Sequence, residues 1–351
     1  MRAPEALEGH RIVGTPRPGH SGADRESCRL AIIVPCYNEG EVLELTIVRL
    51  LDTLDEVISL HGCSQESFVV LVDDGSFDDT WELILTASER HRGRIRGVRL
   101  ARNVGHQPAL LCGLEYVTDQ CDAAISIDAD LQDDPALIPV MIEKYRSGAE
   151  LVFGIRKSRQ SDTWFKRNSA LIFYRLIRWI GSDLVENHAD FRLMSVNALR
   201  NLRGFQERNL FLRGLVPLLH RNIATVTYDR KERLAGETKY PLSKMLSLAW
   251  DGITSFSIKP LRLIAAIGVL VFLSSLAMST YAIIGLVFGR VVPGWTSIVI
   301  PLYLLGGLLM ISMGVVGEYV GKLFLEVKQR PRFIIESTTG VDLREPIIET
   351  R

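Results

Sequence analysis

The fold is decided by one stretch near the middle of the chain, Ile125-Ser126-Ile127-Asp128-Ala129-Asp130-Leu131-Gln132-Asp133-Asp134-Pro135. An apolar, strand-like run ends here in two aspartates that stand two positions apart. On an extended segment such residues point to the same side, so Asp128 and Asp130 can face one divalent cation together. Mg²⁺ and Mn²⁺ prefer oxygen ligands and often share them with substrate phosphates. The stretch indicates phosphate chemistry at the end of a strand, although the bare triplet is also what a solvated acidic turn contains.

Strand-like and helix-like segments alternate around this stretch. Apolar, β-branched runs without polar alternation are typical of buried parallel strands, and they occur at 30–34, 68–72, 95–100, 123–127 and 150–153. Apolar residues at helical spacing predict helices at 41–60, 80–92, 107–117 and 135–145. The alternation predicts an α/β fold with a doubly wound, mostly parallel sheet, whose ligands lie at the carboxyl ends of the strands.

Polar clusters directly follow four of these predicted strands, at 34–39, 72–76, 102–106 and 128–132. In a parallel sheet all four would lie along one edge. The glycine pattern of a dinucleotide site and the G-K-[ST] of a P-loop are both missing from these positions. A substrate phosphate must therefore be met by a metal, which the aspartates can hold.

Composition narrows the class of protein. The 351 residues include 41 basic and 41 acidic side chains, so net charge gives no support to a nucleic-acid partner. Five cysteines without C-x-x-C spacing argue against a disulfide framework or a zinc site and fit a reducing compartment. Residues 1–27 lack an apolar leader segment, and we expect a disordered tail there.

The C-terminal third has the composition of a membrane protein. Residues 263–289 and 297–317 carry no charge, and each run is long enough to span a bilayer. We expect a transmembrane hairpin at 259–323 with spans of about 263–289 and 297–319; two buried core helices are the alternative. Basic residues flank the hairpin on the side of both chain ends, which predicts a cytosolic main domain and a cytosolic tail at 324–351. Basic, aromatic segments at about 162–181 and 241–258 predict interfacial helices.

The motifs V-P-x-Y-N-E, D-D-G-S and D-A-D-L-Q together resemble those of family 2 glycosyltransferases with the GT-A fold. The hairpin and the segment 317–331 narrow the resemblance to bacterial polyprenyl-phosphate glycosyltransferases, near the dolichol-phosphate mannose synthases. The likeness covers about residues 30–335. It implies inverting, Mg²⁺- or Mn²⁺-dependent transfer of a sugar from a nucleotide-sugar, with UDP-glucose as an example, to undecaprenyl or decaprenyl phosphate.

The resemblance also implies a place in the cell and a purpose. Transfer would occur at the cytosolic face of the inner or plasma membrane and would supply cell-envelope glycan or glycolipid modification. A homo-tetramer is a further expectation taken from the family alone.

The resemblance assigns the donor half of the site. Glu39 has an alternative role as a helix-capping carboxylate, and the Asp73-Asp74-Gly75-Ser76 run has one as a plain turn. The implied donor nucleotide contacts are Pro35, Tyr37, Glu39, Asp73, Asp74, Asp128 and Ala129, and the implied metal ligands are Asp128, Asp130 and Gln132.

The acceptor half rests on the segment 187–195, which resembles the family's G-D-F-R-L motif with Ala189 in place of the usual glycine. Its Asp190 matches the position beside the acceptor and is our candidate catalytic residue; His188 ranks below it. A phosphate acceptor already carries negative charge, so Asp190 could instead orient the acceptor. Cations expected to bind the acceptor phosphate are Arg156, Arg208, Arg213 and Lys239.

Two other functions fit parts of the sequence. A processive polysaccharide synthase of the same family typically carries Q-x-x-R-W and more spans, but Arg175 stands where that motif needs glutamine before Arg178-Trp179. A non-catalytic membrane scaffold would predict a decayed metal motif, and here the motif is complete.

Overall fold

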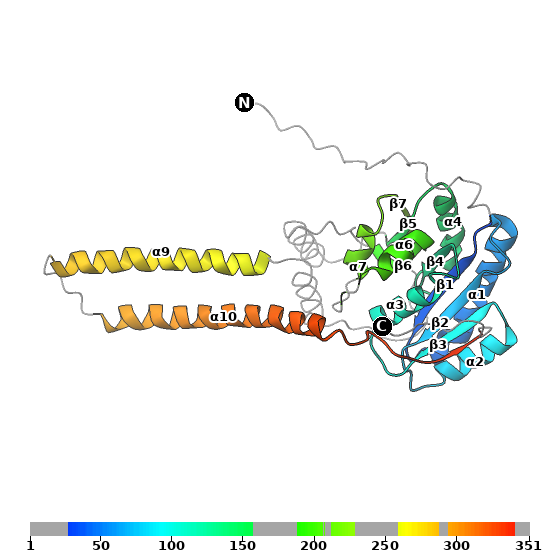
Figure 1. Ribbon diagram of the computed structural model, residues 1–351, viewed down its shortest axis with the longest axis horizontal. Helices are drawn as coiled ribbons and strands as arrows, with labels where there is room; N and C mark the ends of the chain where they lie inside the picture. The colour runs from blue at the N-terminus through cyan, green and yellow to red at the C-terminus, as the bar shows by residue number, and fades with distance from the viewer. Residues whose placement is uncertain are drawn as a thin grey trace, which may run out of the picture.

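The computed structural model describes residues 27–156, 188–205, 207, 212–228, 259–287 and 294–340. An α/β domain lies at one end, and two long helices extend away from it (Figure 1). Several predictions fall outside the described residues: the tail predicted at 1–27, apart from residue 27, the interfacial helices at 162–181 and 241–258, and the candidate cations Arg208 and Lys239.

One eight-stranded sheet forms the centre of the α/β domain, in the order β7-β5-β6-β4-β1-β2-β3-β8. Its strands are β1 (Leu30–Cys36), β2 (Phe68–Asp73), β3 (Ile95–Leu100), β4 (Ala123–Ser126), β5 (Leu151–Arg156), β6 (His188–Ser195), β7 (Ile223–Tyr228) and β8 (Ile335–Thr339). Strands β6 and β8 run against their neighbours, while the other described pairings are parallel. The predicted α/β fold with a mostly parallel sheet is confirmed.

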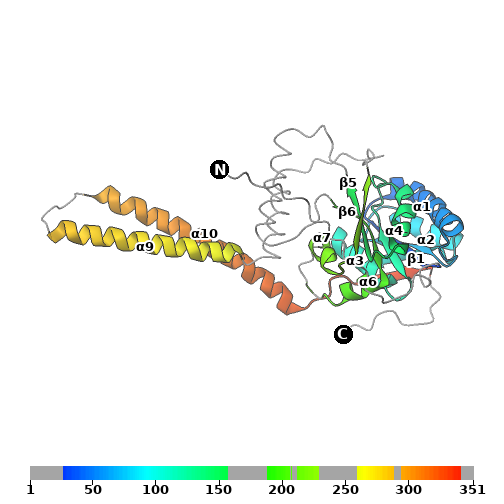
Figure 2. The same cartoon turned by 90° about the horizontal axis from the view of Figure 1, so that it is seen from above.

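Helices cover both faces of the sheet, as the view from above shows (Figure 2). One face packs against α1 (Gly40–His61), α2 (Thr80–Arg90) and α4 (Ile138–Arg146). The other face packs against α3 (His106–Val117), α6 (Val196–Arg203) and the short helix α7 (Leu212–Leu215). Alternate residues of the strands enter the two cores, as in β1, where Ile32 faces one core and Ile33 the other. This is why the strands are apolar throughout.

The predicted C-terminal tail at 324–351 is wrong in part. Residues 295–328 form one continuous helix, α10 (Trp295–Lys328), and β8 then pairs antiparallel with β3 at the edge of the sheet. The α/β domain is therefore assembled from two separated parts of the chain. The sequence 335–339, Ile-Glu-Ser-Thr-Thr, is too short and polar to stand out as a strand.

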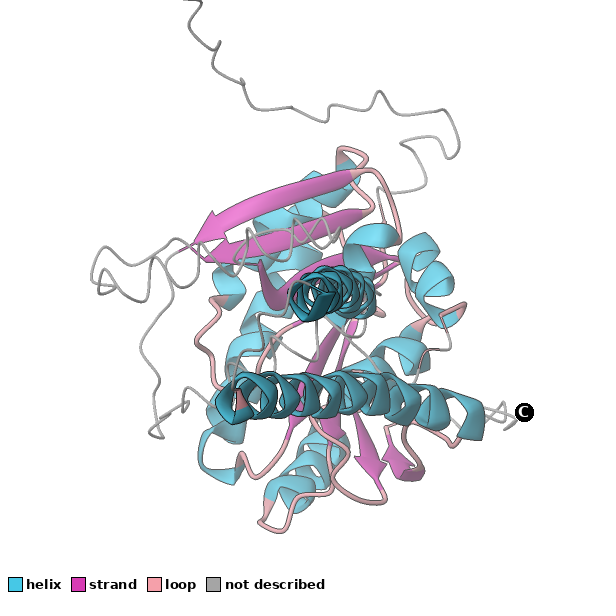
Figure 3. Cartoon of the chain, turned by 90° about the vertical axis from the view of Figure 1, so that its left-hand side faces the viewer, coloured by secondary structure: helices cyan, strands magenta, loops and turns pink. Residues whose placement is uncertain are grey.

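Helix α9 (Lys259–Val287) lies beside α10, and the two project from the α/β domain as a helical pair. Figure 3 views the molecule from the side of this pair. Within the described part of the chain, the segment Leu304–Lys328 is long and apolar enough to cross a membrane, and none of it is buried. A shorter apolar helical segment covers Pro260–Ser274, so the span predicted at about 263–289 stays a prediction. Glu318 and Lys322 pair along α10 at 3.9 Å, as their spacing predicts.

All five cysteines are buried and free, which agrees with the absence of a disulfide framework from the sequence. Cys28 and Cys63 lie with their sulfur atoms 3.6 Å apart. This contact and burial raise the pKa of Cys28, so its thiol stays protonated at neutral pH.

Candidate functional site

The predicted polar clusters converge at one edge of the sheet, beyond the carboxyl ends of the parallel strands. Asp190 reaches the same edge because it lies at the start of the antiparallel strand β6. In the β4–β6 ladder Ser126 pairs with Arg192. Continuing that register by two residues brings Asp128 beside Asp190, on the same side of the sheet.

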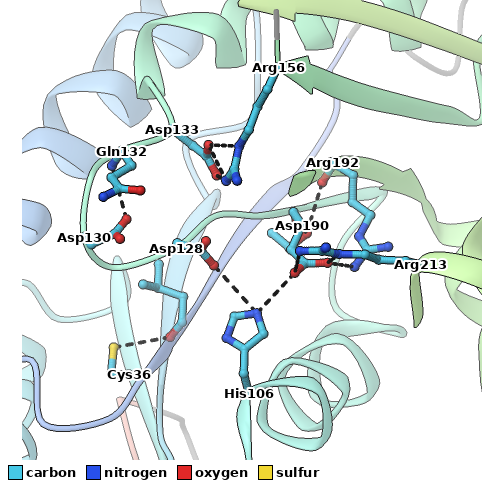
Figure 4. A network of polar contacts seen from close by, with 12 residues as sticks. Cys36, His106, Asp128, Asp130, Gln132, Asp133, Arg156, Asp190, Arg192 and Arg213 are labelled. Carbon is cyan, nitrogen blue, oxygen red and sulfur yellow. Dashed lines mark hydrogen bonds and ion pairs between the residues drawn. The ribbon is translucent and has the colours of Figure 1, made fainter. Parts of the chain in front are cut away.

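His106 lies between these two aspartates (Figure 4). Its Nε2 is 3.7 Å from Oδ1 of Asp128 and 3.6 Å from Oδ2 of Asp190. Burial would lower the pKa of His106, but the interaction with Asp190 and the charges of both aspartates outweigh it, so the pKa is raised. The His106 imidazole thus joins the motif expected to bind the donor to the motif expected to bind the acceptor.

Asp190 is held by two arginines. Nη2 of the buried Arg192 donates to Asp190 Oδ1 at 2.8 Å, and Nη2 of Arg213 donates to Oδ2 at 3.0 Å. Burial would raise the pKa of Asp190, but His106 and the two guanidinium groups keep it well below its usual value. A carboxylate held so firmly in its charged form is a weak proton acceptor and a strong anchor for cations.

Asp128 has the opposite environment. Burial raises its pKa to about 6; Asp133, Asp190 and Asp130 add to the rise, and His106 opposes it. Ionised Asp128 is therefore disfavoured mainly by its burial and further by the neighbouring carboxylates, and a bound cation would relieve both.

The turn after Asp128 arranges the other predicted metal ligands. Leu131 has φ +52°, in the left-handed region, and turns the chain there. The backbone N–H of Gln132 thereby donates to Asp130 Oδ1 at 3.2 Å. The side-chain oxygen of Gln132 is buried and accepts no hydrogen bond within the described residues. No group of three or more His, Cys, Asp and Glu side chains in that part of the chain is arranged to hold a metal. Asp128, Asp130 and the Gln132 oxygen nevertheless suit a cation that takes its remaining ligands from a bound diphosphate.

The Asp73-Asp74-Gly75-Ser76 run is more than a turn. Both oxygens of Asp74 accept backbone N–H groups, from Val104 at 2.8 Å and Gly105 at 2.9 Å, so this side chain fastens the loop after β2 to the loop after β3. Gly75 has φ +66°, and a Cβ there would come within 2.7 Å of the backbone of Arg102, so the approach of the loops requires glycine. Asp73 is fully buried, with Oδ1 accepting the Ser76 N–H at 3.0 Å.

The remaining predicted donor residues occupy the start of the site. Pro35 pairs with Val72 inside the sheet, and the side chain of Tyr37 is 41% exposed. Glu39 is the N-cap residue of α1, as the alternative role expects, although its side chain makes no capping hydrogen bond to that helix. Ala129 is buried, and its carbonyl accepts the Thr46 hydroxyl at 2.7 Å.

Two residues that the sequence reasoning left without a role belong to the site. His106 stood within the 102–106 cluster, but nothing in the sequence shows that it meets Asp128 and Asp190. Asp133 is fully buried; it accepts two hydrogen bonds from Arg156 Nη2, at 2.9 and 3.2 Å, and one from the Tyr228 hydroxyl. Arg156, predicted to bind the acceptor phosphate, therefore already neutralises Asp133. Asp133 is one of several aspartates close together in the sequence, so the sequence does not single it out as the partner of Arg156.

Comparison with known proteins finds a family model that matches part of the chain and relatives that match most of it. Residues 31–203 match the model of a family described as Glycosyl transferase family 2. The chain is 48% identical over 307 residues to the uncharacterized glycosyltransferase YkoT of Bacillus subtilis (strain 168), covering 88% of this chain and 91% of that protein. It is 38% identical to the prophage bactoprenol glucosyl transferase homolog of Escherichia coli (strain K12), covering 88% and 98%. A crystal structure of glucosyl-3-phosphoglycerate synthase from Mycobacterium tuberculosis aligns over 69% of this chain and 84% of that one, with 17% identity and a TM-score of 0.42.

Proposed function

The chain belongs to glycosyl transferase family 2, and we propose that it transfers a sugar from a nucleotide-sugar to a polyprenyl phosphate at the cytosolic face of a membrane. The observation that carries the proposal is the contact of His106 with both Asp128 and Asp190. It brings a donor-binding carboxylate and an acceptor-binding carboxylate to one point, where a transferred sugar would lie between them. Relatives named for bactoprenol glucosyl transfer support a polyprenyl acceptor.

The donor nucleotide would bind between the loops after β1 and β2. Asp73 Oδ2 is buried and accepts no hydrogen bond from the described residues, so it can accept an N–H of a nucleobase such as uracil. The half-exposed ring of Tyr37 offers a stacking surface for that base. We infer a UDP-sugar, with UDP-glucose as the first to test.

The donor diphosphate would be bound through a divalent metal. Asp128, Asp130 and Gln132 are the residues that would hold Mg²⁺ or Mn²⁺, and the pKa of Asp128 is raised by its burial and by the neighbouring carboxylates. The ion, when bound, neutralises charge on the leaving nucleoside diphosphate.

The acceptor half would use Arg213 and Asp190. Arg213 is fixed by Asp190 and is 40% exposed, so its guanidinium can also meet an incoming phosphate. A phosphate monoester is largely dianionic at neutral pH, and its oxygen can attack the anomeric carbon as the bond to the nucleoside diphosphate breaks. This single displacement inverts the anomeric centre. Because Asp190 is a weak base here, we assign it the orientation of Arg213 and the acceptor rather than proton removal.

The helical pair would place this chemistry at the membrane. Large apolar side chains on α10 are widely exposed, among them Leu304 and Met310, both at 72%. Soluble proteins rarely expose such continuous apolar surface. We propose that α9 and α10 are the two spans of a transmembrane hairpin, with the basic residues Arg262, Lys328 and Arg330 on the cytosolic side.

A donor panel tests the function. The full chain is purified in detergent and incubated with undecaprenyl phosphate, Mn²⁺ or Mg²⁺, and UDP-glucose or another nucleotide-sugar. The mass of the lipid product is then measured by mass spectrometry. We expect addition of one sugar to the lipid phosphate and loss of product with EDTA. Successive addition of sugars would indicate a processive synthase, and no product with any donor would contradict the proposal.

A further inference from the structure

Asp73 has an unusual environment for a buried carboxylate. It is fully buried, and it lies directly opposite Arg99 in the β2–β3 ladder. Arg99 Nε is 3.5 Å from Asp73 Oδ2, close enough to balance the charge. Neither atom makes a hydrogen bond within the described residues. Oδ2 therefore has a charged neighbour but no hydrogen-bond donor among the described residues.

A second carboxylate keeps Arg99 in this position. Glu336 of β8 has Oε2 3.4 Å from the same Nε, so the arginine is shared between two carboxylates at nearly equal distance. Its guanidinium carbon also lies 5.7 Å from the centre of the Trp81 ring. Sharing of one N–H between two acceptors explains why Arg99 does not close onto Asp73.

A β-bulge aims Glu336 at this point. Arg99 pairs with Ser337, whereas Leu100 pairs with Ile335, so Glu336 is the extra residue that the ladder skips. Bulges of this kind redirect a side chain and recur beside functional sites.

Strand β8 is fitted closely to its place in the sheet. A Cβ on Gly97 would come within 2.6 Å of the Thr339 side chain, and a Cβ on Gly340 within 2.5 Å of the Ile95 carbonyl oxygen. The Ile334 carbonyl accepts the Ala101 N–H at 2.9 Å. The position of Glu336 is thus set by a close backbone fit rather than by a flexible tail.

We propose that Arg99 is a positioning residue for the donor nucleotide and that Glu336, from the C-terminal strand, holds it there. Arg99 lies against Asp73 Oδ2, and Glu336 prevents Arg99 from occupying the oxygen that the nucleobase needs. This rests on the proposed function, in which Asp73 binds the nucleotide. It makes the segment after the helical pair a part of the donor site, since the strand that returns from α10 supplies Glu336.

The test separates positioning from stability. Glu336→Gln lets Arg99 close onto Asp73, so we expect UDP binding in the presence of Mn²⁺, measured by titration calorimetry on the full chain, to weaken about three- to tenfold. The thermal midpoint should not fall, because the Arg99–Asp73 pair tightens. Arg99→Gln should weaken binding about tenfold or more. The double variant should bind no worse than Arg99→Gln, because Glu336 acts only through Arg99.

Glu66→Gln is the matched control, since Glu66 is also an exposed carboxylate paired with an arginine, Arg29 at 3.3 Å. Glu66 precedes β2, whereas Glu336 lies on β8 beside the end of β3. It should bind UDP like the wild type. Unchanged UDP affinity in Glu336→Gln, or additive losses in the double variant, would overturn the positioning role while leaving the proposed function intact. A wild-type chain that binds no nucleotide would overturn both. If Arg99→Gln does not fold, Glu336→Gln decides the question alone.

Discussion

Asp128→Asn should stabilise the metal-free protein at neutral pH while abolishing transfer. The folded state raises the pKa of Asp128 from 3.8 to about 6, mainly through burial. At about 1.36 kcal/mol per pKa unit, ionised Asp128 costs the fold up to about 3 kcal/mol. The side chain is 30% exposed, so solvent screening reduces this to roughly 1.5 kcal/mol. An asparagine has the same shape and no charge, so it removes this cost.

The sign of the effect depends on pH. A carboxylate whose pKa is raised on folding favours the folded state when protonated, below its unfolded pKa of about 3.9. That advantage is lost as the pH rises through about 6, the folded value. The stabilisation by Asp128→Asn should therefore be largest above pH 7 and should vanish near pH 4, where the wild-type side chain is itself neutral.

The assay is thermal unfolding of the full chain in detergent with EDTA, followed from pH 4 to pH 8. We expect Asp128→Asn to raise the midpoint by about 3–6 °C at pH 7.5, and Mn²⁺ to stabilise the wild type but not the variant. Asp52→Asn, which alters an exposed carboxylate on α1, is the control and should change little. A lowered midpoint at pH 7.5, or a difference that does not change with pH, would refute the reasoning.

Four further predictions test the two halves of the site. Asp130→Asn should abolish transfer at every Mn²⁺ concentration, and wild-type rates in this variant would remove it from the metal site. Asp190→Asn should lower kcat far more than donor affinity; because folding lowers the pKa of Asp190, the accompanying loss of stability should be present above pH of about 4 and disappear on acidification. Arg213→Gln should raise the KM for polyprenyl phosphate about tenfold with the donor KM unchanged, since one charge-assisted contact is lost. A water-soluble short-chain acceptor should be used less efficiently than a long polyprenyl phosphate, and equal efficiency would argue against a membrane-held acceptor.

The parallel part of the fold could be predicted because local signals agree with each other there. The strands from β1 to β5 are buried on both faces and read as continuous apolar runs, and the helices between them show clear helical spacing. Strand β6 carries Asp190 and Arg192 in alternation with apolar residues. The segment is therefore interpreted from sequence as a functional motif, and no strand is predicted there. Strand β8 packs closely against Gly97 of β3, where a side chain would collide with Thr339. A contact between such distant segments leaves no local pattern in the sequence.

The aspartates of the 128–134 stretch show most clearly why the roles of single residues could not be predicted from the sequence. Asp128, Asp133 and Asp134 lie within seven residues, yet their environments differ in kind. Asp128 is crowded by other carboxylates and has a raised pKa, whereas Asp133 is neutralised by Arg156, and Asp134 caps the turn that follows by accepting the Ala136 N–H. The partner of Asp133 lies 23 residues away on β5. Asp128 therefore stands apart from its neighbours because Asp133 is paired from a distant strand and Asp134 accepts a backbone N–H. Removing Arg156 would leave Asp133 unpaired next to Asp128. Asp128 would then no longer be the one carboxylate of the three that has no structural partner in the described loop and is left for a metal.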